Sequence, residues 1–496
     1  MGIIEKQATK NTIFSYSGAA LGFISVIYSA QVLNPDENGL IRLLLSIALL
    51  LAQFAALGFN NITLRYFPYF RNKEKGHHGF LFYGLVISLI GFILCVLFYV
   101  LFKNKLIETN LEKSSLFVDY VIYILPLTFL ILFFNLFDYY LRSFYSSVIG
   151  TSSKDFTQRI IILLVLSLYY FELIPFNSFV FLYAAAVGLP TLILFLYIIK
   201  IGEWHIKPVK GIIDASMRRG MVKLGLYSIL AGGGGLILAN IDIIMVNQIL
   251  GLSETGIYGI AFYFGTIIII PSRSIIRIAT TIISESFKKK DYKEIASIYV
   301  KSCNTQLAIG LLLFVGIWCN IDNIMLLLPE AYRGGEKVIL FIALGYLIDM
   351  ATGVNYVIMI TSKYFRYDGY FMVLILALAV GSNYLLIPKY GISGAAMATA
   401  ITIGTYNLMR WIFILYKFNL QPYNFNTIKL LLIGGILYLI GHYLPTINQF
   451  IADILLRSSV IGASFISLLL LTEASPELNE KIRKNLKLLP FYNSKD

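Results

Sequence analysis

The chain has 496 residues, of which 58% are hydrophobic and only 14% charged, and its formal net charge is +13. Soluble proteins average about 45–50% apolar and about 25% charged residues, so this composition excludes a soluble globular protein. Runs of about 18 or more apolar residues recur along the whole length, as expected for helices that cross a bilayer about 30 Å thick. The sequence therefore predicts an all-α integral membrane protein.

We expect fourteen transmembrane helices, which places both ends of the chain on the same side of the membrane. The apolar runs that define them lie near residues 11–33, 39–64, 80–102, 117–141, 157–174, 178–200, 222–250, 256–284, 299–320, 337–361, 369–387, 391–416, 427–445 and 450–472.

The basic residues of the loops agree with this count. If the N-terminus is cytoplasmic, 29 Lys and Arg residues fall in the cytoplasmic tails and loops, against six in the opposite loops. Membrane insertion retains basic loops on the cytoplasmic side. We therefore expect both termini in the cytoplasm. The same bias accounts for the positive net charge without nucleic-acid binding.

A short polar turn occurs twice in the chain, at an offset of 217 residues. Residues 31–41 read QVLNPDENGLI and residues 248–258 read QILGLSETGIY, so Gln, Leu, Glu and Gly recur in place. Each copy lies between the first and second apolar runs of its half. The pattern predicts two helical hairpins and two related halves, as in transporters built from repeats.

The repeat divides the chain into lobes. We expect an N-lobe at 1–200 with helices 1–6, a cytoplasmic linker at 201–221 and a C-lobe at 222–416 with helices 7–12. Helices 13 and 14 follow at 417–472, and a cytoplasmic tail occupies 473–496.

Charged residues inside spans are costly in lipid and normally face a cavity or a partner. Arg42, Arg273 and Arg277 lie in the second and eighth spans, which are equivalent across the repeat. Arg273 and Arg277 share a helix face beside a kink expected at Pro271. A cleft lined by Arg suits phosphate, because the guanidinium fork matches its oxygens. For Arg410 and Arg457 we favour snorkelling or a structural ion pair.

Three acidic residues also fall inside spans: Asp138, Asp242 and Asp349. They are candidates for coupling transport to H⁺ or Na⁺. The spacing of Asp349, Thr352 and Tyr356 puts all three on one helix face.

Motifs of covalent chemistry are lacking in the sequence. It contains no nucleophile–base constellation, no metalloprotease motif and no Walker loop, so we expect neither an enzyme nor ATP-driven transport. The run Gly232–Gly235 lies inside a span, where close packing or a bend is the better reading than phosphate binding. His77 and His78 are adjacent, a spacing that does not favour metal binding.

The spans, the repeated turn and two further segments together resemble the bacterial polysaccharide flippases of the Wzx type. These belong to the multidrug/oligosaccharidyl-lipid/polysaccharide (MOP) exporter superfamily. The further segments are ANIDIIM at 239–245 and IPKYGISGAA at 387–396.

This resemblance implies a MATE-like bundle of two six-helix lobes with a central cavity that opens alternately to each membrane face. It implies a polyprenyl-diphosphate-linked oligosaccharide as substrate, moved outward across the bacterial inner membrane for O-antigen (lipopolysaccharide), capsule or exopolysaccharide synthesis. A polymerase or glycosyltransferase complex is an expected partner, and no cofactor is expected beyond a coupling ion. Arg42, Arg273 and Arg277 are the residues to which we carry substrate binding.

Alternatives remain open. A lipid II flippase also suits a basic cavity. A multidrug exporter of the same fold would favour an acidic or aromatic cavity, against which the three arginines argue. A membrane scaffold or a glycosyltransferase is a further possibility, although the outer loops are too short for a polyprenyl-dependent transferase.

Overall fold

A computed structural model describes residues 3–144, 146–208 and 213–487, and this part of the chain is helical with no strand. The helices form two compact units, Met1–Ile260 and Ala261–Asp496, and each is described by itself below. The first expectation from composition, an all-α protein, is confirmed.

Among its described residues, the first unit contains ten α-helices, three short 3₁₀ or π segments and the start of α11. Their bounds are α1 Ile3–Val32, α2 Pro35–Ala55, α3 Phe59–Phe70, η1 Gly76–Gly79, α4 Phe80–Asn110, α5 Ser115–Tyr120, η2 Val121–Tyr123, α6 Ile124–Ser143, α7 Ser147–Thr151, η3 Ser152–Thr157, α8 Gln158–Tyr170, α9 Phe176–Lys200, α10 Ala215–Leu250 and α11 Leu252–Thr266.

The second unit begins within α11 and holds the rest of the described helices. Their bounds are η4 Ile267–Ile269, α12 Ser272–Lys289, α13 Tyr292–Trp318, α14 Ile321–Leu326, η5 Glu330–Tyr332, α15 Glu336–Ala351, α16 Asn355–Thr361, α17 Phe365–Tyr390, α18 Ile392–Phe418, α19 Phe425–Tyr443, α20 Phe450–Thr472 and α21 Pro476–Lys487.

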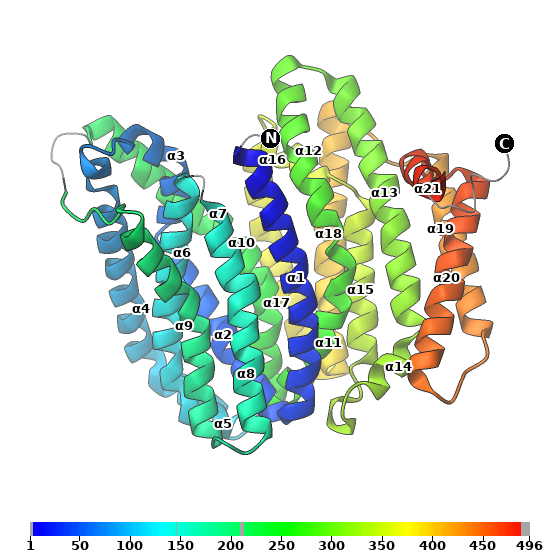
Figure 1. Cartoon of the computed structure of the whole chain (residues 1–496), viewed down its shortest axis with the longest axis horizontal. Helices are drawn as coiled ribbons and strands as arrows, with labels where there is room; N and C mark the ends of the chain where they lie inside the picture. The colour runs from blue at the N-terminus through cyan, green and yellow to red at the C-terminus, as the bar shows by residue number, and fades with distance from the viewer. Residues whose placement is uncertain (1–2, 145, 209–212, 488–496) are drawn as a thin grey trace. The chain divides into compact units, whose positions relative to one another are not determined.

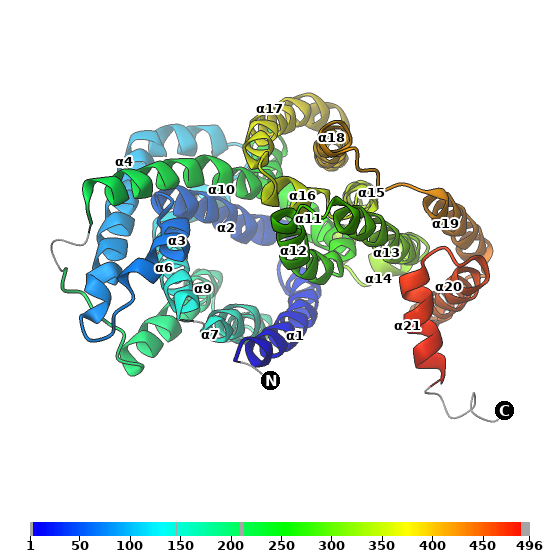
Figure 2. The same cartoon turned by 90° about the horizontal axis from the view of Figure 1, so that it is seen from above.

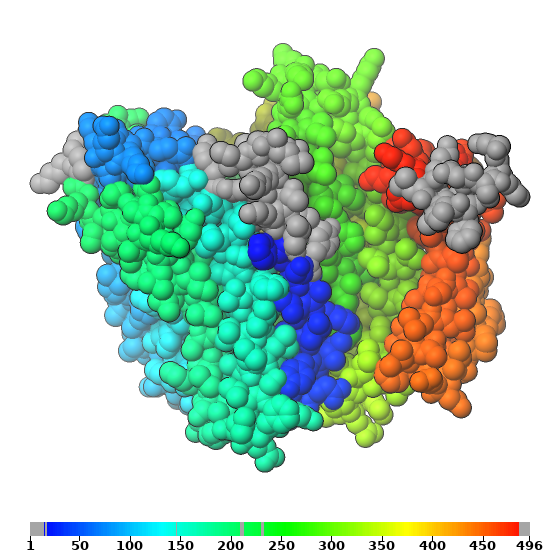
Figure 3. Space-filling view, in the orientation of Figure 1, coloured from blue at the N-terminus to red at the C-terminus, as the bar shows by residue number. Residues whose placement is uncertain are grey.

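Helix α6 lies at the centre of the first unit. It packs against α2 on one side and α9 on the other, and Figure 1 shows these three helices running side by side. Most of its side chains are buried, including Leu132, Leu136 and Tyr140. In Figure 3 α1, in blue, lies against α8, in cyan. Helix α4 instead exposes Leu97, Leu101 and similar side chains, as a lipid-facing helix does.

In the second unit α18 packs between α15 and α17, and α13 joins α15 to the α19–α20 pair (Figure 2). The residues that line these contacts are small. Gly345 faces Ala400, so a side chain at Gly345 would meet the α18 backbone at 3.1 Å. Small residues allow close helix approach where lipid provides no hydrophobic driving force. The expected last helix pair, near 427–445 and 450–472, is formed by α19 and α20.

Both copies of the repeated turn form the expected helical hairpins. In the first, Asn34 caps α2 by accepting a hydrogen bond from the Glu37 N–H, while the Glu37 carboxylate accepts one from the Asn34 N–H. This reciprocal pattern is a capping box. In the second, Gly251 stands at the position of Asn34 with φ of 101°, a conformation that favours glycine. In the first copy a side-chain cap starts the second helix of the hairpin, whereas in the second copy a glycine ends the first helix, α10.

Ten described helices are long and apolar enough to cross a membrane, or eleven if the bent pair α15–α16 counts as one span. Helices α1, α8 and α18 occupy the other three expected spans, but over its described residues none of them is both long enough and apolar enough to be counted with these. The protein is therefore a multi-pass membrane protein, and fourteen spans stays a prediction.

The units do not follow the expected lobe boundaries in one respect. Helix α10 lies in the predicted C-lobe by sequence, yet it packs on α2 and α3 in the first compact unit. Assignment of the lobes from the repeat stays a prediction.

Helix α10 also runs unbroken through Gly232–Gly235, where we expected close packing or a bend.

Candidate functional site

The two copies of the repeated turn pack directly on each other. A methyl group at Gly39 would lie 2.1 Å from the Leu252 carbonyl oxygen, and one at Gly256 would lie 2.0 Å from the Pro35 carbonyl oxygen. Pro35 and Leu252, like Gly39 and Gly256, are related by the offset of 217. The contact is thus symmetric between the repeats, and only glycine at both places lets the backbones approach so closely.

Arg42 lies one turn beyond this contact and crosses to α11. Its Cδ would be 2.1 Å from a methyl group at Gly259, which is the residue equivalent to Arg42 in the second repeat. The arginine of one copy therefore fills the space that the glycine of the other leaves. Arg42 is half-buried. Its positive charge and the positive charge of Arg159 on α8 both interact electrostatically with the Tyr183 hydroxyl on α9. Arg159 and Tyr183 were not among our candidates.

Arg273 and Arg277 are both exposed side chains on α12. The helix starts after Pro271, and the 3₁₀ segment η4 separates it from α11, so the expected interruption at Pro271 is present. Within the described residues neither guanidinium has an ion pair. Arg42 belongs to the first unit and these two to the second, so their grouping in one cleft stays a prediction.

Asp138 and Asp242 are both buried in the first unit. Asp138 on α6 forms an ion pair of 2.6 Å with Arg142, one turn later. Asp242 on α10 accepts a hydrogen bond of 3.0 Å from the Tyr258 hydroxyl on α11. The pair bridges the second copy of the repeated turn. An ion-coupling role for either residue stays a prediction.

Asp349 lies where a membrane helix breaks. Helices α15 and α16 meet at an angle of 57°, and Gly353 between them has φ of 63°. A side chain there would meet the Cys303 backbone nitrogen at 2.8 Å, so the break needs glycine. Broken helices in transporters expose backbone carbonyls and ends of half-helices, which bind ions. Asp349 is one turn before this break.

Asn407 on α18 joins the two sides of the break. Its amide donates to Asp349 Oδ1 at 2.8 Å, and its carbonyl oxygen accepts from Thr352 Oγ1 and from Asn355 Nδ2, each at 2.9 Å. Asp349 and Thr352 therefore share a partner, whereas Tyr356, the third residue of the expected face, lies beyond the break on α16. The site offers carboxylate, amide, hydroxyl and backbone oxygens, which are the donors that hard cations prefer.

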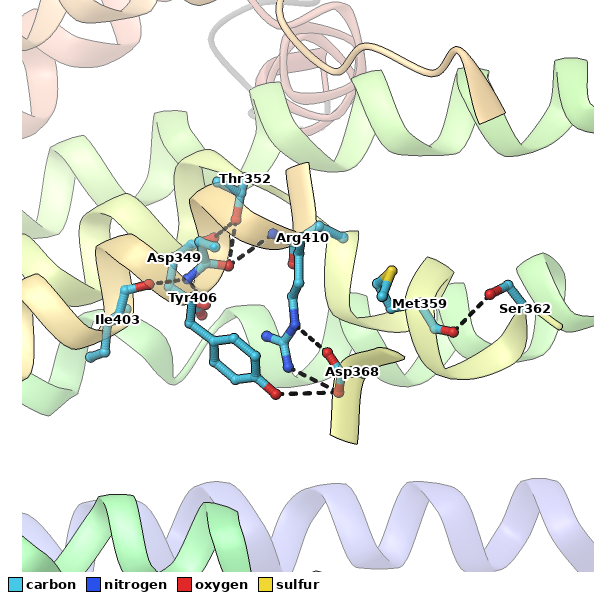
Figure 4. Close-up of polar contacts among 10 residues, drawn as sticks. Asp349, Thr352, Met359, Ser362, Asp368, Ile403, Tyr406 and Arg410 are labelled. Carbon is cyan, nitrogen blue, oxygen red and sulfur yellow. Dashed lines mark hydrogen bonds and ion pairs between the residues drawn. The ribbon is translucent and has the colours of Figure 1, made fainter. Parts of the chain in front are cut away.

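A second polar group lies beside it. Arg410 on α18 donates from Nε to Asp368 Oδ1 at 2.7 Å and from Nη2 to Oδ2 at 3.3 Å. Figure 4 shows Tyr406 and Arg410 both pointing to Asp368. Asp349 and Thr352 lie on the side of Arg410 that is away from Asp368. The Arg410 guanidinium carbon is 3.5 Å from the Tyr406 ring centre. Arg410 thus has the structural ion pair that we favoured.

Arg457 is also buried and paired. Its Nε donates to Asp453 at 2.7 Å, and its other nitrogens donate to the carbonyl oxygens of Gly441 and Leu444. Asn323 donates to the same Asp453 carboxylate. These contacts tie α20 to the end of α19. Arg457 is a structural residue in this arrangement.

Sequence reasoning missed several members of these groups. Asn407 and Asn355 join the Asp349 group from a helix or a half-helix that spacing alone does not relate to it. Asp368 stands at the start of α17, just before the expected span at 369–387, and its partner Arg410 lies 42 residues later. A paired charge of each sign at the same membrane depth is the signal that would have found it.

Comparison with known proteins places the chain. The family described as "Polysaccharide biosynthesis protein" matches residues 6–284, more than half of the chain. The chain belongs to this family. Among curated proteins no match was found.

Solved structures support the fold. The chain is similar to a lipid II flippase MurJ in an inward closed conformation, with a TM-score of 0.72, 13% identity, and coverage of 93% of this chain and 98% of that one. It is similar to a multidrug resistance MATE transporter of the MOP superfamily in an inward-facing conformation, with a TM-score of 0.64, 12% identity and coverage of 81% and 94%.

A MOP superfamily transporter from Pyrococcus furiosus, described as having a binding pocket of reverse polarity, matches with a TM-score of 0.55 and 12% identity. The match covers 84% of this chain and 96% of the Pyrococcus furiosus chain. At these identities the likeness shows the fold alone. The MATE-like transporter and flippase fold that the sequence predicted is confirmed.

Proposed function

We propose that this protein is an alternating-access flippase that moves a polyprenyl-diphosphate-linked oligosaccharide outward across the bacterial cytoplasmic membrane. The observation that carries the proposal is the family match over residues 6–284, because it names polysaccharide biosynthesis. The task needs no covalent chemistry and suits a transporter fold.

The basic residues fit an anionic headgroup. Arg42 lies within a membrane helix, and Arg273 and Arg277 are exposed at the start of α12, beside the interruption at Pro271. A guanidinium binds phosphate through paired hydrogen bonds. A diphosphodiester carries about two negative charges, and moving them outward across an inside-negative membrane is favoured by roughly 2.3 kcal/mol per charge per 100 mV. The barrier is the polar headgroup in hydrocarbon, which a basic, hydrated path lowers.

Asp349 is our first candidate for coupling to H⁺ or Na⁺, with Asp242 and Asp138 next. The Asp349 group stands at a break in a membrane helix and brings together polar side chains from α15, α16, α18 and the turn between the two half-helices. A cation held there links α18 to both parts of the broken span.

A lipid II flippase is the second candidate, favoured by the similarity to MurJ. A multidrug exporter is the third, favoured by the MATE structures, although cationic drugs disfavour an Arg-lined cavity. A gene deletion separates the three. Lost surface polymer with accumulated lipid-linked precursor supports our proposal, lysis points to lipid II, and normal polymer with raised drug sensitivity points to an exporter.

The double substitution Arg273→Gln/Arg277→Gln, expressed in the deletion strain, tests the basic site. Lys288→Gln/Lys290→Gln is the matched control, because it removes the same charge at the other end of the same helix. We expect the arginine variant to restore far less surface polymer than the control. Equal restoration by both variants would leave the function intact and remove these residues from the site.

A further inference from the structure

We propose a divalent metal site, best suited to Zn²⁺, formed by His77, Glu203 and His205 in the first unit. His77 lies between α3 and α4, and the other two follow α9, so 126 residues separate His77 from Glu203. Their ligand atoms all lie within 4.8 Å of one another. The proposal is independent of the transported substrate.

The distances suit a tetrahedral ion. His77 Nε2 is 2.7 Å from Glu203 Oε2, and His205 Nε2 is 3.8 Å from the same oxygen. Two ligands of a tetrahedral Zn²⁺ lie about 3.3 Å apart, since each Zn–N or Zn–O bond is about 2.0–2.2 Å. Shifts of well under 1 Å would bring both pairs to this value. Two imidazoles and one carboxylate leave a fourth position for water.

The three side chains are more buried than a cluster of titratable residues on a protein surface usually is. The His77 and Glu203 side chains are only 3% and 10% exposed, while that of His205 is 33% exposed. A buried carboxylate requires a cationic or hydrogen-bonding partner. The partly exposed His205 gives an ion a route in from solvent, which a metal site also needs.

The backbone holds His77 in a strained conformation. Four successive residues, 76–79, have positive φ, with values of 47° at His77 and 53° at His78. L-residues with a side chain are disfavoured in this region, because the side chain crowds the backbone. Strain of this kind persists where surrounding contacts fix it and is concentrated at functional sites. Here it directs the His77 ring at Glu203.

The segment after α9, which carries Glu203 and His205, is also held by specific contacts. The Tyr140 hydroxyl donates to the Glu203 carbonyl oxygen at 3.1 Å, and the Trp204 ring packs edge-on against Phe195. A methyl group at Gly79 would lie 2.3 Å from the Lys207 carbonyl oxygen, so the two segments lie backbone to backbone. The two segments that carry the ligands are therefore fixed against each other, and a metal ion would join the start of the predicted linker to the α3–α4 loop.

Two neighbours moderate the affinity. The Asn72 N–H donates to His77 Nδ1 at 3.1 Å, which leaves the proton of the neutral ring on Nε2, facing Glu203. Metal binding moves that proton to Nδ1 and gives up the Asn72 bond. Loss of such an outer contact weakens binding by about 10–100-fold. The cationic Arg71 is also close and opposes a second positive charge.

The test uses the full chain, purified in detergent with any affinity tag removed and metal stripped with chelator. Zn²⁺ is titrated by calorimetry, bound metal is counted by mass spectrometry, and Co²⁺ serves as a spectroscopic probe of four-fold coordination. The variants are His77→Asn, Glu203→Gln and His205→Gln. Asn tolerates positive φ, so His77→Asn preserves the turn. His78→Asn is the matched control at the neighbouring residue.

We expect one Zn²⁺ per chain, an intense visible Co²⁺ spectrum, and a thermal midpoint that rises with Zn²⁺. Each ligand variant should bind at least about tenfold more weakly, while His78→Asn binds as the parent does. If buried Glu203→Gln fails to fold, the partly exposed His205→Gln decides the question. Lack of stoichiometric Zn²⁺ in the parent, or unchanged binding by His205→Gln, would overturn the proposal.

Discussion

Gly39 and Gly256, which hold the same place in two copies of one turn, lie against each other with their backbones in direct contact. Each faces the carbonyl oxygen of the residue that begins the other hairpin helix, Leu252 for Gly39 and Pro35 for Gly256. A sequence repeat here appears in space as a symmetric contact. The contact fixes how α2 meets α11, and hence where Arg42 is placed.

Gly39→Ala should destabilise the protein. The new methyl group would lie 2.1 Å from the Leu252 carbonyl oxygen, and backbone cannot yield as a flexible side chain does. We expect a loss of about 1–3 kcal/mol, the usual cost of overpacking, measured as a lower thermal midpoint in detergent. Gly381→Ala on α17 is the control, since a methyl group there meets nothing within 4 Å. An equal effect at both positions would show that the backbone contact is unimportant.

Gly259→Leu should act on transport through Arg42. Its side chain would occupy the place where Arg42 Cδ now lies and displace the guanidinium while leaving the charge in the protein. If Arg42 binds the diphosphate headgroup, we expect Gly259→Leu and Arg42→Gln to reduce surface polysaccharide alike and to accumulate lipid-linked precursor. Gly404→Ala serves as the control, because its methyl group would meet only Ile348 at 3.9 Å. Normal polymer in both variants would exclude Arg42 from the site.

Arg410→Gln should be among the most destabilising single changes. It leaves Asp368, which is only 8% exposed, without its two charged hydrogen bonds. Removing one partner of a buried ion pair costs about 3–5 kcal/mol.

The matched comparison is Arg333→Gln. Its partner Glu330 is 3.7 Å away, and both side chains are largely exposed. Surface pairs contribute only about 0–1 kcal/mol, so the thermal midpoint should scarcely change. Comparable losses in the two variants would mean that Arg410 is not held as described.

Asp349→Asn should affect ion dependence more than stability. The amide keeps the shape of the group and an oxygen toward Asn407, but it loses the negative charge that would hold a cation. We expect transport in reconstituted vesicles to lose its response to a Na⁺ or H⁺ gradient while the thermal midpoint stays close to that of the parent. Asp322→Asn, on the short helix α14, is the control. An unchanged gradient response in Asp349→Asn would move coupling to Asp242, Asp138 or another residue.

Composition and residue pattern were enough to predict the class of the protein and the order of its main helices. Apolar runs gave the helices, because a bilayer leaves the backbone few ways to satisfy its hydrogen bonds. The repeated turn predicted both hairpins, and Pro271 predicted an interruption, since proline cannot donate within a helix. Burial of unpaired charge in lipid is costly, so Arg410 and Arg457 could be expected to have partners.

Contacts between residues far apart in the sequence could not be predicted from these patterns. Asn407 joins Asp349, Thr352 and Asn355 from a different helix. Glu203 contacts His77 although the two are 126 positions apart in the sequence. Local periodicity reports the face of a helix but not the neighbour that the face contacts. The contact of Gly39 with Gly256 was equally hidden, because the repeat shows that two segments are alike and not that they touch. These contacts depend on how the helices pack, and small residues determine where two helix backbones can approach closely.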